Sequence, residues 1–199
     1  MEQHTLKKFN HPEEIGEWYD NKYTEMGGGW VTPPDDVMTH LKYIGLLKMN
    51  KPTLLDIGCG GGHFIEVAKN YADCTGIELS VVGLTECKKR CPESKFLYAD
   101  IEHFKPREKF DIAVSIGSIE HTLNIDKAMK NIYKNVVKSG GFFYAYAPNE
   151  LWQHFDQPHE QTHTDEEWEE IFTKPGFKIV KKERINNNTR FLLKKDLQI

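Results

Sequence analysis

The stretch Leu54-Leu-Asp-Ile-Gly-Cys-Gly-Gly-Gly-His-Phe64 decides how the rest of the chain is interpreted. Its first residues form a short apolar run, which is typical of a buried strand, and helical spacing follows the glycines. Gly58, Gly60 and Gly62 allow a tight turn, and because they carry no Cβ they also let a ligand approach the backbone. A strand, a glycine loop and a helix in this order predict a ligand site at the end of a strand.

Two details of this loop argue against a dinucleotide ligand. The dinucleotide pattern G-x-G-x-x-G, started at Gly58, requires glycine at position 63, where this chain has His63. Asp56 precedes the first glycine, and a carboxylate there repels a pyrophosphate but suits a ligand with ammonium and sulfonium groups. A glycine loop alone is weak evidence, because a simple turn between strand and helix also uses one.

Strands and helices are predicted to alternate along the chain. Apolar runs predict strands at 53–57, 74–78, 95–99, 110–115 and 141–147. Helical spacing predicts helices at about 62–71, 80–91, 125–138 and 164–173. The helices at 80 and 164 have Ser80 and Thr164 as expected N-caps, and Ser139-Gly140-Gly141 is a stop signal for the third. Residues 178–184 and 190–195 are typical of a closing antiparallel pair.

This order predicts an α/β fold, a Rossmann-like three-layer sandwich with a mostly parallel seven-stranded sheet and one antiparallel strand. We expect a single domain over residues 1–199. Residues 1–50 form an N-terminal helical cap segment, and residues 51–199 form the core, with an irregular, histidine-rich insert at 148–164. Ligands of such sheets bind at the carboxyl ends of the strands, which the cap and the insert can both reach.

Acidic residues follow the second and third predicted strands. Glu78 lies beside the glycine loop, where a carboxylate can accept hydrogen bonds from both hydroxyls of a ribose. Asp100 can accept from an adenine amino group, and Ile101 can cover the ring. Taken singly, Glu78 is also explained as a charge at a helix N-terminus and Asp100 as a turn residue.

Five segments together resemble one known family. They are Asp56-Ile-Gly-Cys-Gly-Gly-Gly62, Gly76-Ile-Glu-Leu-Ser80, Ala99-Asp-Ile101, the segment from Phe110 to Ile119-Glu-His121, and Lys138-Ser-Gly-Gly-Phe-Phe-Tyr144. In this order they resemble the class I S-adenosylmethionine-dependent methyltransferases, especially the ubiquinone-biosynthesis-like, type 11 methyltransferase-domain group. The resemblance covers about residues 50–185. It is specific for fold and cofactor and poorly specific for the acceptor.

The resemblance implies an S-adenosylmethionine site, with S-adenosylhomocysteine as product. The residues it assigns to the cofactor are Asp56, Gly58, Cys59, Gly60, Gly62, Glu78, Leu79, Asp100, Ile101, Ile116 and Gly117. Two departures restrict the acceptor. The fourth strand ends in Ser115-Ile-Gly-Ser rather than the N/D-P-P-Y/F of enzymes that methylate exocyclic amines, and only Asn149 and Glu150 partly match the acidic pair of magnesium-dependent enzymes. We therefore expect no metal.

Histidines and aromatic residues are the candidates for the acceptor side. A general base within hydrogen-bond reach helps a hydroxyl acceptor to react, and histidine is the usual one; we expect His121 and His159 to be catalytic. The alternatives are a surface or capping histidine and, for His154, His159 and His163, a zinc site. The expected acceptor-lining residues are Tyr19, Tyr23, Trp30, Tyr146, Trp152 and His163, although aromatic residues often serve only packing.

Composition and charge narrow the class of function. The formal net charge of −4 disfavours a nucleic-acid partner, which usually selects a basic face. No apolar run approaches the roughly 20 residues of a membrane span. The first residues lack the apolar region of a signal peptide, so we expect a cytoplasmic protein whose four cysteines are reduced. A metal or redox role for Cys87 and Cys91, four residues apart, is the alternative.

We therefore expect S-adenosylmethionine-dependent methyl transfer to a small-molecule acceptor, at oxygen. Two other functions remain open. One is a non-catalytic module that binds S-adenosylmethionine without turnover. The other is an RNA methyltransferase, which the charge disfavours.

Overall fold

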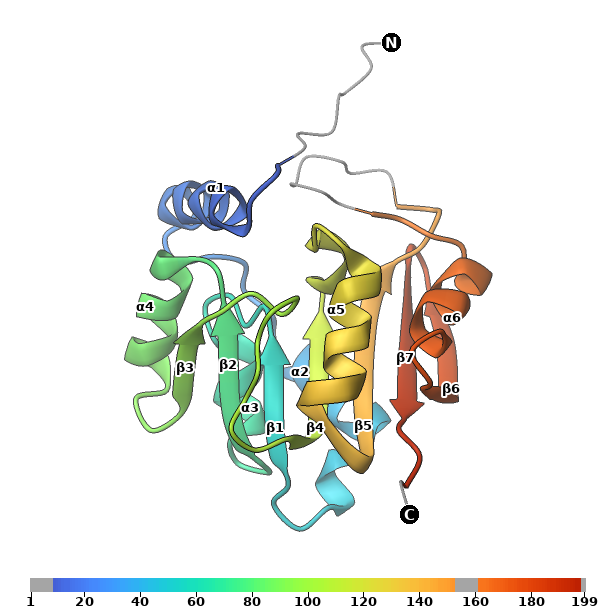
Figure 1. The fold of residues 1–199 in the computed structure, drawn as a ribbon. Coiled ribbons are helices and arrows are strands. Elements are labelled where there is room, and N and C mark those ends of the chain that lie inside the picture. Colours follow the sequence, from blue (N-terminus) through green and yellow to red (C-terminus); the bar gives the residue numbers. More distant parts are fainter. Residues whose placement is uncertain (1–8, 153–160, 198–199) are drawn as a thin grey trace.

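The structure is a computed structural model that describes residues 9–152 and 161–197 (Figure 1). Its middle layer is a seven-stranded sheet in the order β3-β2-β1-β4-β5-β7-β6. The strands are β1 Thr53–Ile57, β2 Asp73–Glu78, β3 Lys95–Tyr98, β4 Phe110–Ile116, β5 Val137–Pro148, β6 Lys178–Ile185 and β7 Asn188–Lys194.

The directions of the strands confirm the predicted fold class. β1 to β5 pair in parallel with one another, whereas β7 runs antiparallel to both β5 and β6. β6 and β7 are joined by a tight turn at Asn186, whose φ of 54° is in the left-handed region that asparagine tolerates better than most residues. The sheet is thus mostly parallel with one antiparallel strand.

Helices cover both faces of the sheet. The main helices are α1 Pro12–Glu25, α2 Pro34–Ile44, α3 His63–Ala68, α4 Val81–Arg90, α5 Ile125–Asn131 and α6 Asp165–Thr173. The shorter turns are η1 Leu46–Lys48, η2 Ile119–His121 and the π-helical η3 Ile132–Val136. α1 lies beyond the ends of the strands, above α4 (Figure 1).

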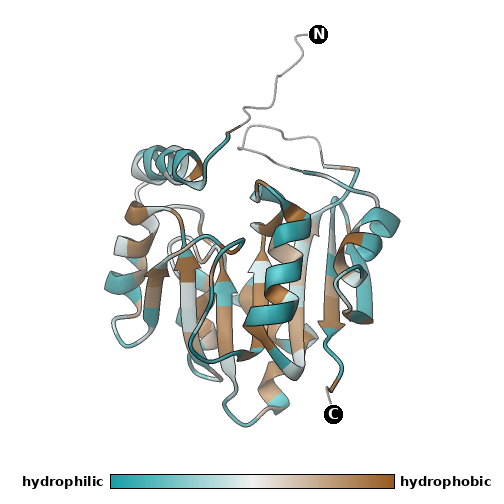
Figure 2. Ribbon diagram, viewed as in Figure 1, coloured by the Kyte–Doolittle hydropathy of each residue, from teal (hydrophilic) through white to brown (hydrophobic). Residues whose placement is uncertain are grey.

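The core divides into two clusters because successive residues of a strand point to opposite faces. Leu54 and Tyr144 belong to the cluster shared with α2, α3 and α4. Leu55 and Phe143 belong to the cluster shared with α5 and α6, whose Trp168 is fully buried. In Figure 2 the strands are largely hydrophobic, whereas α5 is hydrophilic over much of its visible side. This alternation fixes the register of the sheet against both helical layers.

Two predicted helix starts are confirmed by their caps. The Ser80 hydroxyl accepts from the Gly83 N–H at 2.9 Å. Thr164 and Glu167 form the predicted capping box, because the Thr164 hydroxyl accepts from the Glu167 N–H and the Glu167 carboxylate accepts from the Thr164 N–H.

The predicted end of the helix at 125–138 is wrong. α5 ends at Asn131, η3 continues to Val136, and β5 already begins at Val137. Val137 pairs with Phe110 of β4, and the pairing register then shifts before Ile112. Gly140, with φ of 77°, lies inside this irregular part of the strand. The glycines therefore accommodate a bulge in β5, and pairing with β4 ends the helix first.

Candidate functional site

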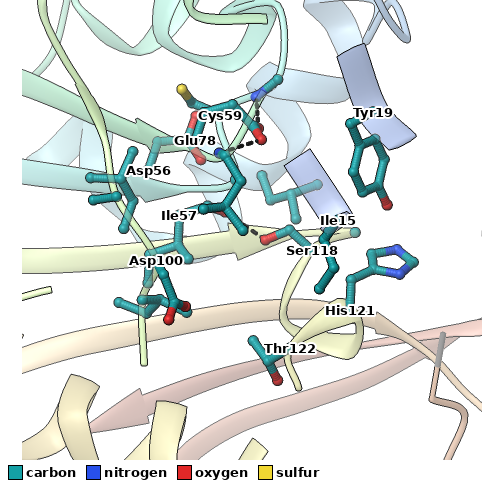
Figure 3. A pocket seen from close by; sticks show the side chains of 18 of the residues that line it. Ile15, Tyr19, Asp56, Ile57, Cys59, Glu78, Asp100, Ser118, His121 and Thr122 are labelled. Carbon is teal, nitrogen blue, oxygen red and sulfur yellow. Dashed lines mark hydrogen bonds between the residues drawn. The ribbon is translucent and has the colours of Figure 1, made fainter. Parts of the chain in front are cut away.

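A cavity of about 370 Å³ lies at the carboxyl ends of β1, β2 and β4 and the loop after β3 (Figure 3). β1 is paired with β2 on one side and β4 on the other, so the order of the strands reverses there. Open parallel sheets bind ligands at such a switch point, outside the ends of the strands. The volume is in the range of small-molecule sites.

The glycine loop after β1 forms one wall of this cavity. Gly58 and Gly60 have φ values of 71° and 51°, in the region that favours glycine. A Cβ on Gly58 would lie 2.5 Å from the Ser118 Cβ, and the Ser118 hydroxyl donates to the Ile57 carbonyl at 2.6 Å. Glycine at 58 therefore also lets the loop after β4 pack against the loop after β1.

Glu78, at the end of β2, holds the glycine loop in place. One carboxylate oxygen accepts from the Gly60 N–H at 2.9 Å, and the other accepts from the N–H groups of Leu79 and Ser80 at 2.7 and 3.0 Å. Burial raises the pKa of Glu78, and these three hydrogen bonds oppose the rise. Because a carboxylate offers about four acceptor positions, Glu78 keeps room for a ligand hydroxyl.

Asp56 lies near the end of β1 and also lines the cavity. Its side chain is buried, and only 3% of the residue is exposed. Burial, and secondarily the charge of Glu78, raise the pKa of Asp56 to about 8. Among the described residues that line the cavity there is no lysine or arginine. A positively charged ligand group would therefore relieve the repulsion between these two buried carboxyl groups.

Asp100 follows β3 and brings a third carboxylate to the cavity. Its two oxygens are restrained from different sides. One accepts from the Glu102 N–H at 2.9 Å, and the other lies 2.6 Å from Nδ1 of His103. Ile101 lines the cavity beside it and is buried.

α1 closes the cavity opposite the sheet. Asp20 attaches this helix to the start of α4, because its carboxylate accepts from the Ser80 hydroxyl at 2.6 Å and the Val82 N–H at 2.9 Å. Ile15, Tyr19 and Tyr23 of α1 form a small buried cluster whose members line the cavity. The sequence interpretation anticipated the two tyrosines and missed Ile15, although its spacing from Tyr19 was an available signal.

A second cavity, of about 200 Å³, adjoins the first. His121 lines both, and only 7% of it is exposed. Figure 3 shows its ring beside Tyr19, and the two ring centroids are 5.9 Å apart. Glu120 lines the smaller cavity, where its carboxylate lies 3.9 Å from Nε2 of His121. Glu120 was missed as a site residue, although it stands in the Ile119-Glu-His121 segment.

The structure brings most of the predicted site residues together. The larger cavity is lined by Tyr19, Tyr23, Trp30, Asp56, Gly58, Cys59, Gly60, Glu78, Leu79, Asp100, Ile101, Ile116, Gly117, His121 and Trp152. It is also lined by residues that were not predicted, including Thr32, Glu102, Ser118, Thr122 and Leu123.

Three predicted residues that the structure describes do not line the larger cavity. Tyr146 lines only the smaller cavity. Gly62 lies at the N-cap of α3, where a Cβ would be 3.1 Å from Cys87 Sγ, so its position serves packing. His163 lines neither cavity and packs edge-on against Trp168. His159 lies outside the described residues.

The cysteines are packed into the core. Cys59 and Cys87 have sulfur atoms 3.7 Å apart, and the Cys87 thiol donates to the Gly60 carbonyl at 3.0 Å. The hydrogen bond with Cys87 and burial raise the pKa of Cys59 well above its ordinary value, which keeps the thiol protonated. Within residues 9–152 and 161–197, no three His, Cys, Asp or Glu side chains are arranged to hold a metal ion.

Comparison with known proteins identifies related sequences. Residues 55–145 match the model of a family described as a methyltransferase domain. The chain is 27% identical over 130 residues to a dTDP-3-amino-3,4,6-trideoxy-alpha-D-glucopyranose N,N-dimethyltransferase of Streptomyces venezuelae, covering 61% of this chain and 52% of that protein. It is 33% identical over 97 residues to a ubiquinone biosynthesis O-methyltransferase of Pelagibacter ubique, covering 46% and 40%. The chain thus spans about half the length, or less, of these relatives.

Solved structures share the fold. The cyclase SpnF superposes with a TM-score of 0.76 at 17% identity, covering 98% of this chain and all of that one. Magnesium protoporphyrin IX methyltransferase from Synechocystis PCC 6803, with bound S-adenosylmethionine, superposes with a TM-score of 0.72 at 12% identity, covering 94% and 99%. Along the parts of the chain that the structure describes, no helix combines the length and apolar character that crossing a membrane requires.

Proposed function

We propose that this chain, which belongs to the class I S-adenosylmethionine-dependent methyltransferases, transfers a methyl group from S-adenosylmethionine to a small-molecule acceptor, at oxygen. The observation that carries the proposal is the convergence of Asp56, Glu78 and Asp100 on one cavity beside a glycine loop. These three carboxylates lie at the ends of three adjacent strands.

The residues present fit the cofactor. Asp56 and the loop backbone at Gly58 and Gly60 would hold the methionine portion, with the Asp56 carboxylate opposite the ammonium. Glu78 would accept from a ribose hydroxyl at its one remaining acceptor position. Asp100 would accept from the adenine amino group, and Ile101 would cover the ring. When bound, S-adenosylmethionine supplies an activated methyl group on a sulfonium, so the protein contributes mainly binding, orientation and proton removal.

Calorimetric titration with S-adenosylhomocysteine tests the cofactor assignment. We expect a dissociation constant in the micromolar range and no binding of NAD. Binding of NAD with no response to S-adenosylhomocysteine would overturn the proposal.

Cofactor binding is expected to release a proton at pH 7. The Asp56 carboxyl, with a pKa of about 8, is mostly protonated in the free protein. An ammonium placed beside it lowers this pKa, so the carboxyl ionises on binding and up to roughly one proton leaves. The release shrinks above pH 8, where the free carboxyl is already ionised. The measurement is the binding enthalpy in phosphate and in Tris, whose ionisation enthalpies differ. Equal binding enthalpies in the two buffers would contradict the release of a proton. Asp56→Asn is the control, because this variant has no carboxyl to ionise and its enthalpies in the two buffers should be equal.

The charge of the site restricts the acceptor. Among the residues that the structure describes, both cavities are lined by carboxylates and histidines and by no lysine or arginine. A negatively charged acceptor would find no cation of the described lining to offset the cost of its burial, and only the sulfonium of the cofactor would oppose its charge. This lining supports a hydroxyl acceptor that is neutral or positively charged, rather than a carboxylate or a phosphorylated compound. A screen of hydroxyl, amine and carboxylate compounds with radiolabelled S-adenosylmethionine tests this restriction.

His121 is the base that we propose for the acceptor's proton, and its position where the two cavities meet supports this role. We expect His121→Ala to lower turnover of the acceptor found by the screen by about 10²–10⁴-fold. The affinity of the His121→Ala variant for S-adenosylhomocysteine should stay within about twofold of wild type, since a general base acts on the acceptor. An equal loss of cofactor affinity and turnover would instead place His121 in the cofactor site. His159 remains a second proposed base.

Other functions predict different results. A module without turnover would bind S-adenosylhomocysteine and methylate no compound of the panel. An RNA methyltransferase would bind RNA with a strong dependence on salt. The fold alone does not distinguish among these functions, since a cyclase shares it.

A further inference from the structure

A series of hydrogen-bonded side chains begins at Asp100, which lines the cavity, and leads from there to the surface. The Asp100 carboxylate lies 2.6 Å from Nδ1 of His103, and Nε2 of His103 lies 2.5 Å from Nζ of Lys127 on α5. Lys127 also lies 3.7 Å from the buried Glu102 carboxylate. The other oxygen of Glu102 accepts from the Asn124 N–H at the start of α5. Glu102 and Asn124 thus connect this series of side chains to the loop after β3 and to the start of α5.

The donors and acceptors of the three groups favour one placement of the protons. A lysine ammonium has donors and no acceptor, so Nε2 of His103 must accept from Lys127. Nδ1 then carries the proton of the imidazole and donates it to Asp100. The contact with Lys127 thus favours the tautomer of His103 that donates to Asp100.

These contacts restrain the Asp100 carboxylate and leave some of its acceptor positions unused. One oxygen accepts from the Glu102 N–H and the other from His103, which together prevent rotation of the carboxylate. Since each carboxylate oxygen offers two acceptor positions, Asp100 can still accept from a ligand in the cavity that it lines. A carboxylate held in this way discriminates between a donor and an acceptor on the ligand.

We propose that His103, with Lys127 behind it, is a positioning residue that makes Asp100 select a base carrying an exocyclic amino group over one carrying a carbonyl at the same place. This inference rests on the proposed function, in which Asp100 faces the adenine. His103 touches neither the cofactor nor the acceptor in this assignment, and it acts by orienting the Asp100 carboxylate.

The test compares the dissociation constants of S-adenosylhomocysteine and S-inosyl-L-homocysteine, in which a carbonyl replaces the amino group. Wild type should favour the adenosyl compound at least tenfold, and Asp100→Ala should bring the ratio close to one. His103→Ala should reduce the ratio at least threefold, chiefly by weakening the adenosyl compound. Lys127→Met should reduce it less, and the matched Lys130→Met on α5 should leave it unchanged.

A structural role for His103 makes a different prediction, because it would weaken both compounds equally or lower the melting temperature alone. His103→Asn, whose amide nitrogen can donate from near the position of Nδ1, should restore most of the ratio. A wild-type ratio in His103→Ala, or an unchanged ratio in Asp100→Ala, overturns the inference while the proposed function stands. Failure of the wild-type protein to bind S-adenosylhomocysteine overturns both.

Discussion

Replacement of Glu78 by glutamine is expected to weaken S-adenosylhomocysteine binding by at least tenfold. Both oxygens of Glu78 accept backbone hydrogen bonds, one from Gly60 and the other from Leu79 and Ser80. In Glu78→Gln an amide NH₂ takes the place of one of these oxygens and meets an N–H donor. Hydrogen bonds to a charged group contribute about 1.5–3 kcal/mol each, and a buried donor left without an acceptor adds its own cost.

The glutamine variant is informative because it keeps the shape of the side chain. A residue that only bound ribose would tolerate an amide better than alanine, since an amide still accepts at its oxygen. A residue that also holds the glycine loop should tolerate neither. We therefore expect Glu78→Gln and Glu78→Ala to lose affinity to a similar extent and to melt at lower temperature than wild type. The control is Glu93→Gln, which alters an exposed carboxylate paired with Lys69. Wild-type affinity in Glu78→Gln would contradict this account of the loop.

The fold could be predicted from the sequence because its information is local. Strands such as Thr53–Ile57 and Phe110–Ile116 are short apolar runs, and the N-caps Ser80 and Thr164 lie beside the helices that they begin. The end of α5 could not be predicted in the same way. The pairing of Val137 with Phe110 joins residues far apart in the chain, and it prevails over the local stop signal at the glycines.

The same distinction between local and long-range information applies to the site residues. Asp56, Glu78 and Asp100 could be predicted because each ends or follows a strand, and parallel strands end at the same edge of the sheet. The attachment of α1 could not, since Asp20 lies 60 residues from Ser80 and belongs to no motif, and the motif around Ser80 does not indicate its partner. The second role of Glu78, as the acceptor of three backbone N–H groups, could not be predicted either, because the sequence does not show which backbone N–H groups point at its carboxylate.

The other large effect is expected at Gly60, where a side chain should remove cofactor binding without unfolding the protein. Gly60 lines the larger cavity with φ of 51°, and a Cβ there would lie 3.3 Å from the hydroxyl of Tyr23, which lines the same cavity. A methyl group in Gly60→Ala would stand between the loop and α1, and the larger side chain of Gly60→Val would fill more of that space. We expect Gly60→Ala to lower affinity for S-adenosylhomocysteine at least tenfold and Gly60→Val to abolish binding.

The effect must be separated from backbone strain, because a residue with a Cβ costs about 1–2 kcal/mol in the left-handed region wherever it lies. Gly45 provides the matched control: its φ is 83°, and a Cβ there would have no heavy atom within 4 Å. Gly45→Ala and Gly60→Ala should therefore lose similar free energy of unfolding, measured by denaturant titration, while only Gly60→Ala loses cofactor affinity. Equal and small changes in affinity for the two variants would mean that the loop does not approach the ligand at Gly60. In that case Glu78 would hold a loop whose backbone serves only the packing of α1 and α4.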